Sequence, residues 1–320
     1  MAVYTEVSDE ELIAFVADYH IGEVVSCKGI AEGVENSNYL LRTDDGTYIL
    51  TLYEKRVKEA DLPFFLGLLE HLALKGLPSA TPLRGRDGDA LRRLCGRPAA
   101  ICTFLEGMWP RRVTPEHCDA LGAVMARLHV AGADFTIERP NALSVASWRP
   151  LLEASGVRAD EVLPGLAAEL AAELDVLEKA WPTNLPAGVI HADLFPDNVF
   201  FRSDILSGII DFYFACNDFF AYDLAVCLNA WCFENDGSFN ATKARRLLTA
   251  YRKVRPISEH ELAFLPLLAQ GSAMRFLLTR LYDWLHTPAD ALVTRKDPLE
   301  YLGKLRFHRA VASPGAYGLD

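Results

Sequence analysis

Short runs that alternate between apolar and polar residues dominate the first hundred positions, and this period of two is typical of β-strands buried on one face. Runs of this kind lie near residues 24–31, 38–43, 47–53, 89–94 and 98–105. The sequence TDDG at residues 43–46 separates the second run from the third and predicts a hairpin between them. We therefore expect a twisted antiparallel sheet in this part of the chain.

Apolar residues at helical spacing occur at two places around this sheet. Ser8 and Glu11 form a capping box, which predicts a helix from there to about Tyr19. A second helix is predicted over about residues 57–75. Gly76 follows Lys75 and marks the end of that helix, because glycine readily adopts the left-handed conformation that closes helices.

From Thr114 onward the spacing of apolar residues is that of helices. Thr114 followed by Pro115 is typical of a helix start, and the first of these helices runs to about Ala131. Further helices are predicted over about residues 160–181, 219–233, 240–253, 258–286 and 297–311. Short apolar runs near residues 188–191, 198–202 and 207–211 predict strands among them.

These patterns predict an α+β fold with two lobes. Residues 1–105 would form an N-terminal lobe, an antiparallel sheet with one inserted helix. Residues 106–320 would form a mostly helical C-terminal lobe. The seam is a short apolar run that ends in glycine, at residues 103–107.

Charge and cysteine content limit the classes of partner. The net charge of −11 argues against general binding to nucleic acid or to anionic membranes. No uncharged apolar run reaches the ~18 residues of a membrane span, and the acidic start of the chain lacks the pattern of a secretory signal. Seven cysteines are scattered without a CxxC pair, which is typical of reduced thiols. We expect a cytoplasmic protein, a monomer or small homo-oligomer, that acts on a small molecule.

Polar residues interrupt two apolar runs in the C-terminal part: His191, Asp193 and Asn198 in VIHADLFPDNVFF, and Asp211 in GIIDF. Metal-dependent phosphoryl transfer uses such a set, because one carboxylate orients the attacking hydroxyl while an amide and a second carboxylate hold Mg²⁺. The spacing matches the kinase catalytic loop H-R-D-x-x-x-x-N with alanine in the place of arginine. The DFY sequence that begins at Asp211 stands where kinases carry DFG.

Two other interpretations of this cluster are open. It could be a turn-rich loop whose polar side chains only bond the backbone. Alternatively, His191 and Asp193 could be ligands of a metallohydrolase, which would need further histidine or carboxylate ligands at short spacing.

The segments HADLFPDN and IIDF, set after a β-rich region and among helices, resemble the aminoglycoside-phosphotransferase/choline-kinase family, whose fold is protein-kinase-like. The likeness covers nearly the whole chain. The segments GIAEGVENSNYLL, YILTLYEKR, ICTFLEG and LGAVMARLH occur in the family's order of phosphate loop, third strand, hinge and first C-lobe helix. Within the family, EGVENSNYLL, ILTLYEKR and GSAMRFLLTRLYDW are similar to the homoserine kinases. The resemblance implies ATP- and Mg²⁺-dependent phosphorylation of the hydroxyl of homoserine to O-phosphohomoserine, a step of threonine biosynthesis.

The resemblance also implies roles for the polar cluster. Asp193 would be the catalytic base or hydroxyl-orienting residue, with Asn198 and Asp211 as Mg²⁺ ligands. His191, although part of the catalytic motif, would shape the loop rather than transfer a proton. Asp223 matches a family residue that braces the catalytic loop; by itself it could equally be an acid that favours a helix N-terminus.

On the nucleotide side, a glycine-containing segment between two predicted strands would let backbone N–H groups approach phosphate, although it is not a GxGxxG motif and could be an ordinary hairpin. The candidate residues are Gly29, Gly33, Asn36, Ser37 and Asn38, with Phe104 and Leu105 at the hinge for adenine.

The third strand departs from the kinase pattern. Kinases carry a phosphate-binding lysine there, whereas this chain has Thr51 or Leu52. Candidate replacements for the missing cation are Lys28, Lys55 and Arg56. An inactive nucleotide-binding module would also lose this lysine, but retention of the three polar groups of the catalytic motif argues against that alternative.

For the acceptor, Arg275 and Arg280 stand in an apolar helical stretch and could bind a carboxylate. An internal salt bridge to Asp218, Asp223 or Asp283 is the alternative for either arginine. Aromatic residues could wall a pocket or simply pack in the core. Because Trp231, Tyr282 and Trp284 could form an aromatic cage, choline or ethanolamine stays an alternative acceptor, as do methylthioribose and aminoglycosides.

Overall fold

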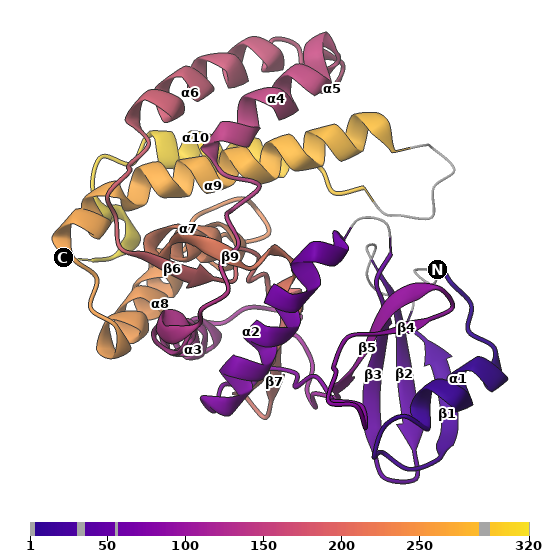
Figure 1. Ribbon diagram of the computed structural model, residues 1–320. Coiled ribbons are helices and arrows are strands. Elements are labelled where there is room, and N and C mark those ends of the chain that lie inside the picture. The colour runs from indigo at the N-terminus through magenta and orange to yellow at the C-terminus, as the bar shows by residue number, and fades with distance from the viewer. Residues whose placement is uncertain (1–3, 31–35, 55–56, 288–294, 320) are drawn as a thin grey trace.

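The computed structural model describes residues 4–30, 36–54, 57–287 and 295–319. Its N-terminal lobe is an antiparallel sheet of strand order β1-β2-β3-β5-β4 (Figure 1). The strands are β1 (Val24–Gly29), β2 (Ser37–Thr43), β3 (Thr47–Leu52), β4 (Arg92–Leu94) and β5 (Arg97–Thr103). The predicted strands and the hairpin between β2 and β3 are confirmed.

Two helices accompany this sheet. Helix α1 (Asp9–Val16) begins at Ser8, whose side chain accepts the N–H of Glu11, as the capping box predicts. Helix α2 (Leu62–Leu74) starts later than predicted, because a 3₁₀ turn at Glu59–Asp61 precedes it and proline occupies its first turn. It ends at Lys75, and Gly76 follows in the left-handed conformation at φ +77°.

The two helices belong to different hydrophobic cores. Apolar residues of α1 pack with the sheet, for example Phe15 with the cluster that contains Leu41 and Leu50. Those of α2 pack into the large core of the C-terminal lobe. Polar contacts add to this, since Arg139 Nε lies 2.9 Å from the carboxylate of Asp61. Helix α2 therefore ties the sheet to the helical lobe. The division at residue 105 stays a prediction.

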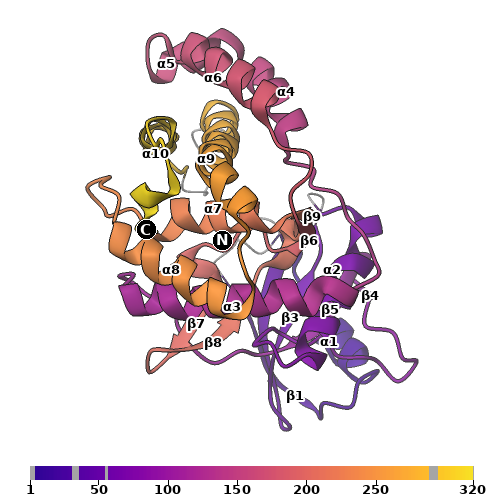
Figure 2. The ribbon, with the colours of Figure 1, turned by 90° about the vertical axis from the view of Figure 1, so that its left-hand side faces the viewer.

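The C-terminal lobe is mostly helical. Its helices are α3 (Pro115–Ala131), α4 (Val145–Ser155), α5 (Ala159–Val162), α6 (Leu166–Ala180), α7 (Phe220–Trp231), α8 (Ala241–Val254), α9 (Glu259–His286) and α10 (Leu299–Arg309). In both ribbon views α9 lies between the layer of α4 to α6 and the central α7 (Figures 1 and 2). The predicted α+β architecture is confirmed.

Two features of this lobe differ from the expectation. Helix α4 was not predicted, and it contains Pro150, a residue that normally breaks a helix. The helix predicted over residues 160–181 is two helices, because Gly165 between them takes the left-handed conformation at φ +82°.

Short strands carry the central loops of the lobe. They are β6 (Ala187–Ile190), β7 (Val199–Arg202), β8 (Ile205–Ile209) and β9 (Cys216–Phe219). Strand β6 pairs with β9, and β7 pairs with β8. Strand β9 was not predicted, since its sequence CNDF is short and half polar. The predicted strands are confirmed within a few residues at their ends.

Helix α9 is long and apolar enough to cross a membrane by length and composition. In this fold, however, 67% of its most apolar stretch is buried inside the protein. It packs against α4, α7 and α10, as the central helix of a folded core does.

Candidate active site

The loop between β6 and β7 carries Asp193, and the carboxylate of Asp223 holds its backbone. Asp223, fully buried in the first turn of α7, accepts the N–H of His191 at 3.0 Å and the N–H of Ala192 at 2.8 Å. Ala192 has a positive φ of 61°, which is unfavourable for a residue with a Cβ. The two hydrogen bonds therefore fix a strained backbone directly before Asp193.

His129 also contacts Asp223, a contact that the sequence interpretation missed. Its Nε2 donates to Asp223 Oδ2 at 3.0 Å, and its Nδ1 accepts the hydroxyl of Tyr251 at 2.7 Å. Burial lowers the pKa of His129, which favours a neutral ring. The only sequence signal was its position at the end of the segment LGAVMARLH, because its partners are about a hundred residues away.

His191 joins the two halves of the polar cluster. Its Nε2 donates to the carbonyl of Ile210 at 3.0 Å, directly before Asp211, and its Nδ1 accepts the N–H of Asp193 at 3.3 Å. Burial lowers the pKa of His191, so the buried ring stays neutral. Both ring nitrogens are used inside the protein, an arrangement that suits positioning rather than proton transfer.

Asp193 and Asn198 are in direct contact. Asn198 Nδ2 donates to the carbonyl oxygen of Asp193 at 2.8 Å and lies 3.4 Å from its carboxylate oxygen Oδ2. Burial raises the pKa of Asp193 to about 8; Arg275 and Lys296 oppose this rise, and Asp211 adds to it. The carboxyl group is thus poorly hydrated and lies among several charges, as expected of an acid–base group in an active site.

Asp211 follows β8 and has a left-handed backbone with φ +64°. The N–H of Ile210 donates to the carbonyl of Asn198 at 3.0 Å, so the two predicted metal ligands are carried by hydrogen-bonded segments. Because Nδ2 of Asn198 is engaged with Asp193, its Oδ1 is the atom left for a ligand. An amide oxygen and a carboxylate are hard donors, and they fit Mg²⁺ with water and phosphate as further ligands.

Arg275 contacts the catalytic loop itself. Its Nη1 donates to the carbonyl of Ala192, and its guanidinium lies 4.4 Å from the ring centroid of Phe276. Asp218 is engaged with Asn141 at 2.7 Å rather than with Arg275. The arginine is almost completely buried. The expected roles of Arg275 were acceptor binding or a salt bridge to Asp218 or Asp223. Its hydrogen bond to the carbonyl of Ala192 is neither of these.

Arg280 is held by an acid on the next helix. Its Nη1 lies 2.6 Å from Glu300, and its guanidinium lies 4.4 Å from the centroid of Tyr301. Lys304 shares the same carboxylate at 2.6 Å. The partner of Arg280 is therefore an internal acid, although not one of those that the sequence interpretation named.

Each of the aromatic residues considered for a cage has contacts of its own within the protein. Trp231 is buried and donates from Nε1 to the carbonyl of Leu194 at 2.7 Å. Tyr282 stacks on His286, with centroids 4.2 Å apart. Trp284 lies under the guanidinium of Arg295. These contacts give no support to an aromatic cage for choline.

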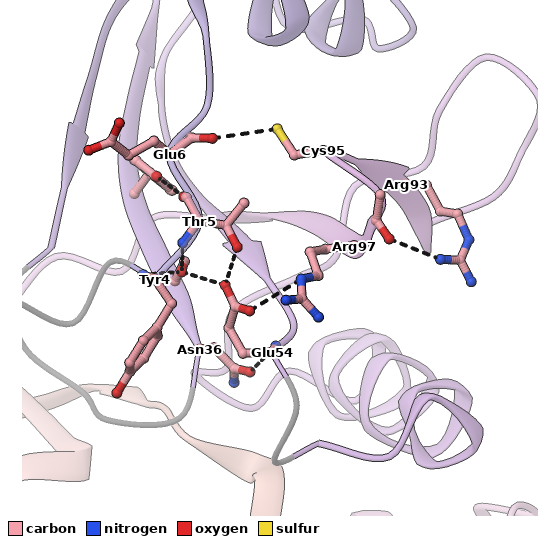
Figure 3. Close-up of polar contacts among 11 residues, drawn as sticks. Tyr4, Thr5, Glu6, Asn36, Glu54, Arg93, Cys95 and Arg97 are labelled. Carbon is pink, nitrogen blue, oxygen red and sulfur yellow. Dashed lines mark hydrogen bonds and ion pairs between the residues drawn. The ribbon is translucent and has the colours of Figure 1, made fainter.

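The segment after the predicted phosphate loop is held by Glu54. Ser37 donates to this carboxylate at 2.7 Å, and Asn36 accepts the N–H of Glu54 at 3.2 Å (Figure 3). Thr5 donates to Glu54 at 2.7 Å, and Arg97 lies 3.4 Å from it. Both side chains are buried, and the Ser37 hydroxyl and Asn36 Oδ1 are used in internal hydrogen bonds. Gly29 ends β1, and Gly33 lies outside the described residues.

Thr51, one of the two residues expected at the place of the kinase lysine, lies on β3. The Thr51 hydroxyl donates to Asn38 Oδ1 at 2.8 Å. Asn38, the third polar candidate of the phosphate loop, is therefore also engaged in an internal hydrogen bond. Glu70, the acid in α2, pairs with Arg84 at 2.6 Å. Lys28 is exposed on β1, while residues 55 and 56 lie outside the described residues. The replacement cation stays a prediction.

The predicted hinge leads from β5 into the helical lobe. Phe104 is exposed and Leu105 partly buried. Gly107 follows with φ +145°, and a Cβ there would meet the Ser207 hydroxyl at 2.4 Å, so glycine is required at this close approach. The same hydroxyl donates to the carbonyl of Glu106 at 2.7 Å. The linker is thereby fixed against β8.

Among the residues that the structure describes, no group of three or more His, Cys, Asp or Glu could hold a metal ion. The metallohydrolase interpretation, which needs such a group, gains no support from this part of the chain.

Comparisons with known proteins identify the family of the chain. A model described as the phosphotransferase enzyme family matches residues 26–257. Homoserine kinase of Paramagnetospirillum magneticum is 66% identical over 326 residues, with 100% of both chains covered. Homoserine kinase of Rhodospirillum rubrum is 66% identical over 320 residues, again with 100% of both chains covered.

Solved structures give the same fold. Amicoumacin kinase hAmiN, in complex with AMP-PNP and Ca²⁺, matches with a TM-score of 0.71 at 15% identity, covering 96% of this chain and 95% of that one. A spectinomycin phosphotransferase matches with a TM-score of 0.69 at 13% identity, covering 98% of each chain. At these identities the likeness concerns the fold alone.

Proposed function

The chain belongs to the phosphotransferase enzyme family, and on that premise we propose that it transfers the γ-phosphoryl group of ATP to the hydroxyl of homoserine, giving O-phosphohomoserine. The observation that carries the choice of acceptor is the 66% identity, over the full length, to homoserine kinases. The protein is a small-molecule kinase, and it uses ATP with a divalent cation.

We propose Mg²⁺ as that cation, with Oδ1 of Asn198 and the carboxylate of Asp211 as its protein ligands. Bound Mg²⁺ supplies positive charge that neutralises the phosphate oxygens during transfer. A backbone hydrogen bond links the segments that carry the two ligands, since the carbonyl of Asn198 accepts the N–H of Ile210. The left-handed backbone of Asp211 turns the chain sharply after β8.

Asp193 acts on the acceptor in this proposal. Its carboxylate accepts the hydroxyl hydrogen of homoserine and orients the oxygen for in-line attack. His191 and Asp223 contribute by holding the loop through the bonds described above, and neither exchanges a proton with the acceptor. The backbone of the segment that Glu54 supports, together with the hinge at Phe104 and Leu105, would contact the nucleotide.

An ADP-release assay tests the proposal, with homoserine, serine, choline, methylthioribose and an aminoglycoside offered separately. Homoserine is expected to give the highest kcat/KM of the five. ADP release with homoserine no faster than with ATP alone would contradict the proposed acceptor. A stronger signal with another alcohol would keep the kinase chemistry and replace the acceptor.

The acidic net charge and reduced cysteines lead us to propose a cytoplasmic location.

A further inference from the structure

Three cations around the catalytic loop and Tyr301 are already engaged. Arg275 is buried and donates to a main-chain carbonyl of the loop. Arg280 and Lys304 each lie 2.6 Å from Glu300, so the two cations share one acid. An acceptor carboxylate at Arg280 or Lys304 would compete with Glu300. Arg275 is only 2% exposed, although its Nε has no hydrogen-bond partner among the described residues.

Lys296 differs from them. It is exposed, and no ion pair of Lys296 occurs among the residues that the structure describes. Its Nζ lies 5.5 Å from the ring centroid of Phe195, whose N–H donates to the carbonyl of Asp193 at 2.8 Å. Its charge also acts on the carboxyl group of Asp193. An exposed cation thus lies over the ring of Phe195, two residues along the chain from the proposed catalytic residue.

The neighbours of Lys296 in the chain are anchored on both sides. Arg295 donates to the carbonyl of Trp284 at 3.1 Å and lies over its ring. Asp297 accepts the N–H of Leu299 at 2.8 Å at the start of α10, and its carbonyl accepts Nη1 of Arg280 at 3.2 Å. The backbone that presents Lys296 is therefore fixed to α9 and α10, while its side chain makes no hydrogen bond or ion pair within the part of the chain that the structure describes.

We propose that Lys296 binds the carboxylate of the acceptor amino acid while the acceptor's hydroxyl lies against Asp193. This inference rests on the proposed function. Homoserine carries its carboxylate three carbons from its hydroxyl, so in this proposal its two ends face the two residues. Lys296 belongs to the segment between α9 and α10, whereas the groups proposed for the nucleotide belong to the N-terminal lobe, the hinge and the loop ends at Asn198 and Asp211.

Steady-state kinetics with two alcohols tests the assignment. Homoserine and 3-aminopropan-1-ol share the hydroxyl, the amine and the chain between them, and differ by the carboxylate. Lys296→Met is expected to lower kcat/KM for homoserine about 10- to 100-fold, as loss of a charge-assisted hydrogen bond does, and to leave 3-aminopropan-1-ol nearly unchanged. Lys296→Arg keeps the charge and is expected to retain most of the preference for homoserine. Lys179→Met, which removes an exposed lysine of α6, is the matched control and should behave as the wild type.

Each other outcome overturns the inference. If Lys296→Met lowers kcat/KM equally for both alcohols, the lysine does not recognise the carboxylate. If instead the KM for ATP rises, Lys296 binds phosphate. If kcat/KM for homoserine is unchanged, Lys296 binds neither the carboxylate nor phosphate. Absence of homoserine turnover in the wild type would contradict the proposed function itself, which separates the two failures.

Discussion

Arg275 donates a hydrogen bond from Nη1 to the carbonyl oxygen of Ala192, the residue directly before Asp193. The N–H of Ala192 donates to the carboxylate of Asp223 on another helix. Ala192, a residue in an unfavourable left-handed conformation, is thus held at both its N–H and its carbonyl, by an anion on α7 and a cation on α9. The position of Asp193 depends on both.

We predict that Arg275→Met lowers kcat about 10- to 100-fold while changing KM for ATP and homoserine less than about threefold. Methionine retains apolar packing but leaves the carbonyl of Ala192 without its charged donor, at a cost of about 1–3 kcal/mol. Steady-state kinetics measures the effect. Arg275→Lys, which can still donate, should recover part of kcat. A rise in the homoserine KM with unchanged kcat would instead favour acceptor binding by Arg275.

Asp193→Asn should lower kcat about 10³-fold, because the amide keeps the shape of the side chain but accepts protons poorly, and general-base catalysis contributes about 10²- to 10⁴-fold. ATP binding should persist, since Asp193 is not among the groups proposed to hold the nucleotide. Rapid-quench measurement of ADP formation and titration with a non-hydrolysable ATP analogue test both parts. Turnover near that of the wild type would remove Asp193 from its proposed role.

Asp223→Asn should reduce the stability of folding by about 3 kcal/mol, since a buried carboxylate that accepts hydrogen bonds from His129 and two loop N–H groups loses its charge. Urea unfolding measures this loss. Although burial opposes it, the bonds from His129 and the loop lower the pKa of Asp223. A lowered carboxylate pKa stabilises the fold above the ordinary aspartate pKa of about 3.9, and this contribution disappears as the pH falls through the lowered value.

The pH dependence of the free energy of unfolding therefore distinguishes the wild type from Asp223→Asn. The wild type should lose more stability than Asp223→Asn between about pH 5 and pH 2, because only the wild type has this carboxylate to protonate. Parallel loss in both proteins would show that Asp223 contributes no charge-dependent stability. Glu10→Gln, an exposed acid on α1, serves as the control and should follow the wild type.

The elements and the motif could be predicted from the sequence because both depend on local spacing. Asp193, Asn198 and Asp211 lie next to short strands whose apolar runs are visible in the sequence. The helix caps at Ser8 and Thr114 also have recognisable local sequences. The contacts that fix the catalytic loop could not be predicted from the sequence, because each joins residues far apart in the chain. His129 reaches Asp223 across 94 positions, and Arg275 reaches Ala192 across 83.

The nucleotide side leads to a last prediction, which concerns Glu54. This buried acid accepts hydrogen bonds from Thr5 and Ser37, so it ties the start of the chain to the segment after the predicted phosphate loop. Glu54→Ala should raise KM for ATP about 10-fold with little change in KM for homoserine, because the loop end loses its support while the acceptor side is untouched. Initial-rate kinetics at saturating co-substrate separates the two constants. Glu6→Ala removes a nearby acid whose side chain makes no bond to Ser37 and should leave both constants unchanged. An equal rise in both KM values would show that Glu54 supports the fold as a whole rather than the nucleotide loop.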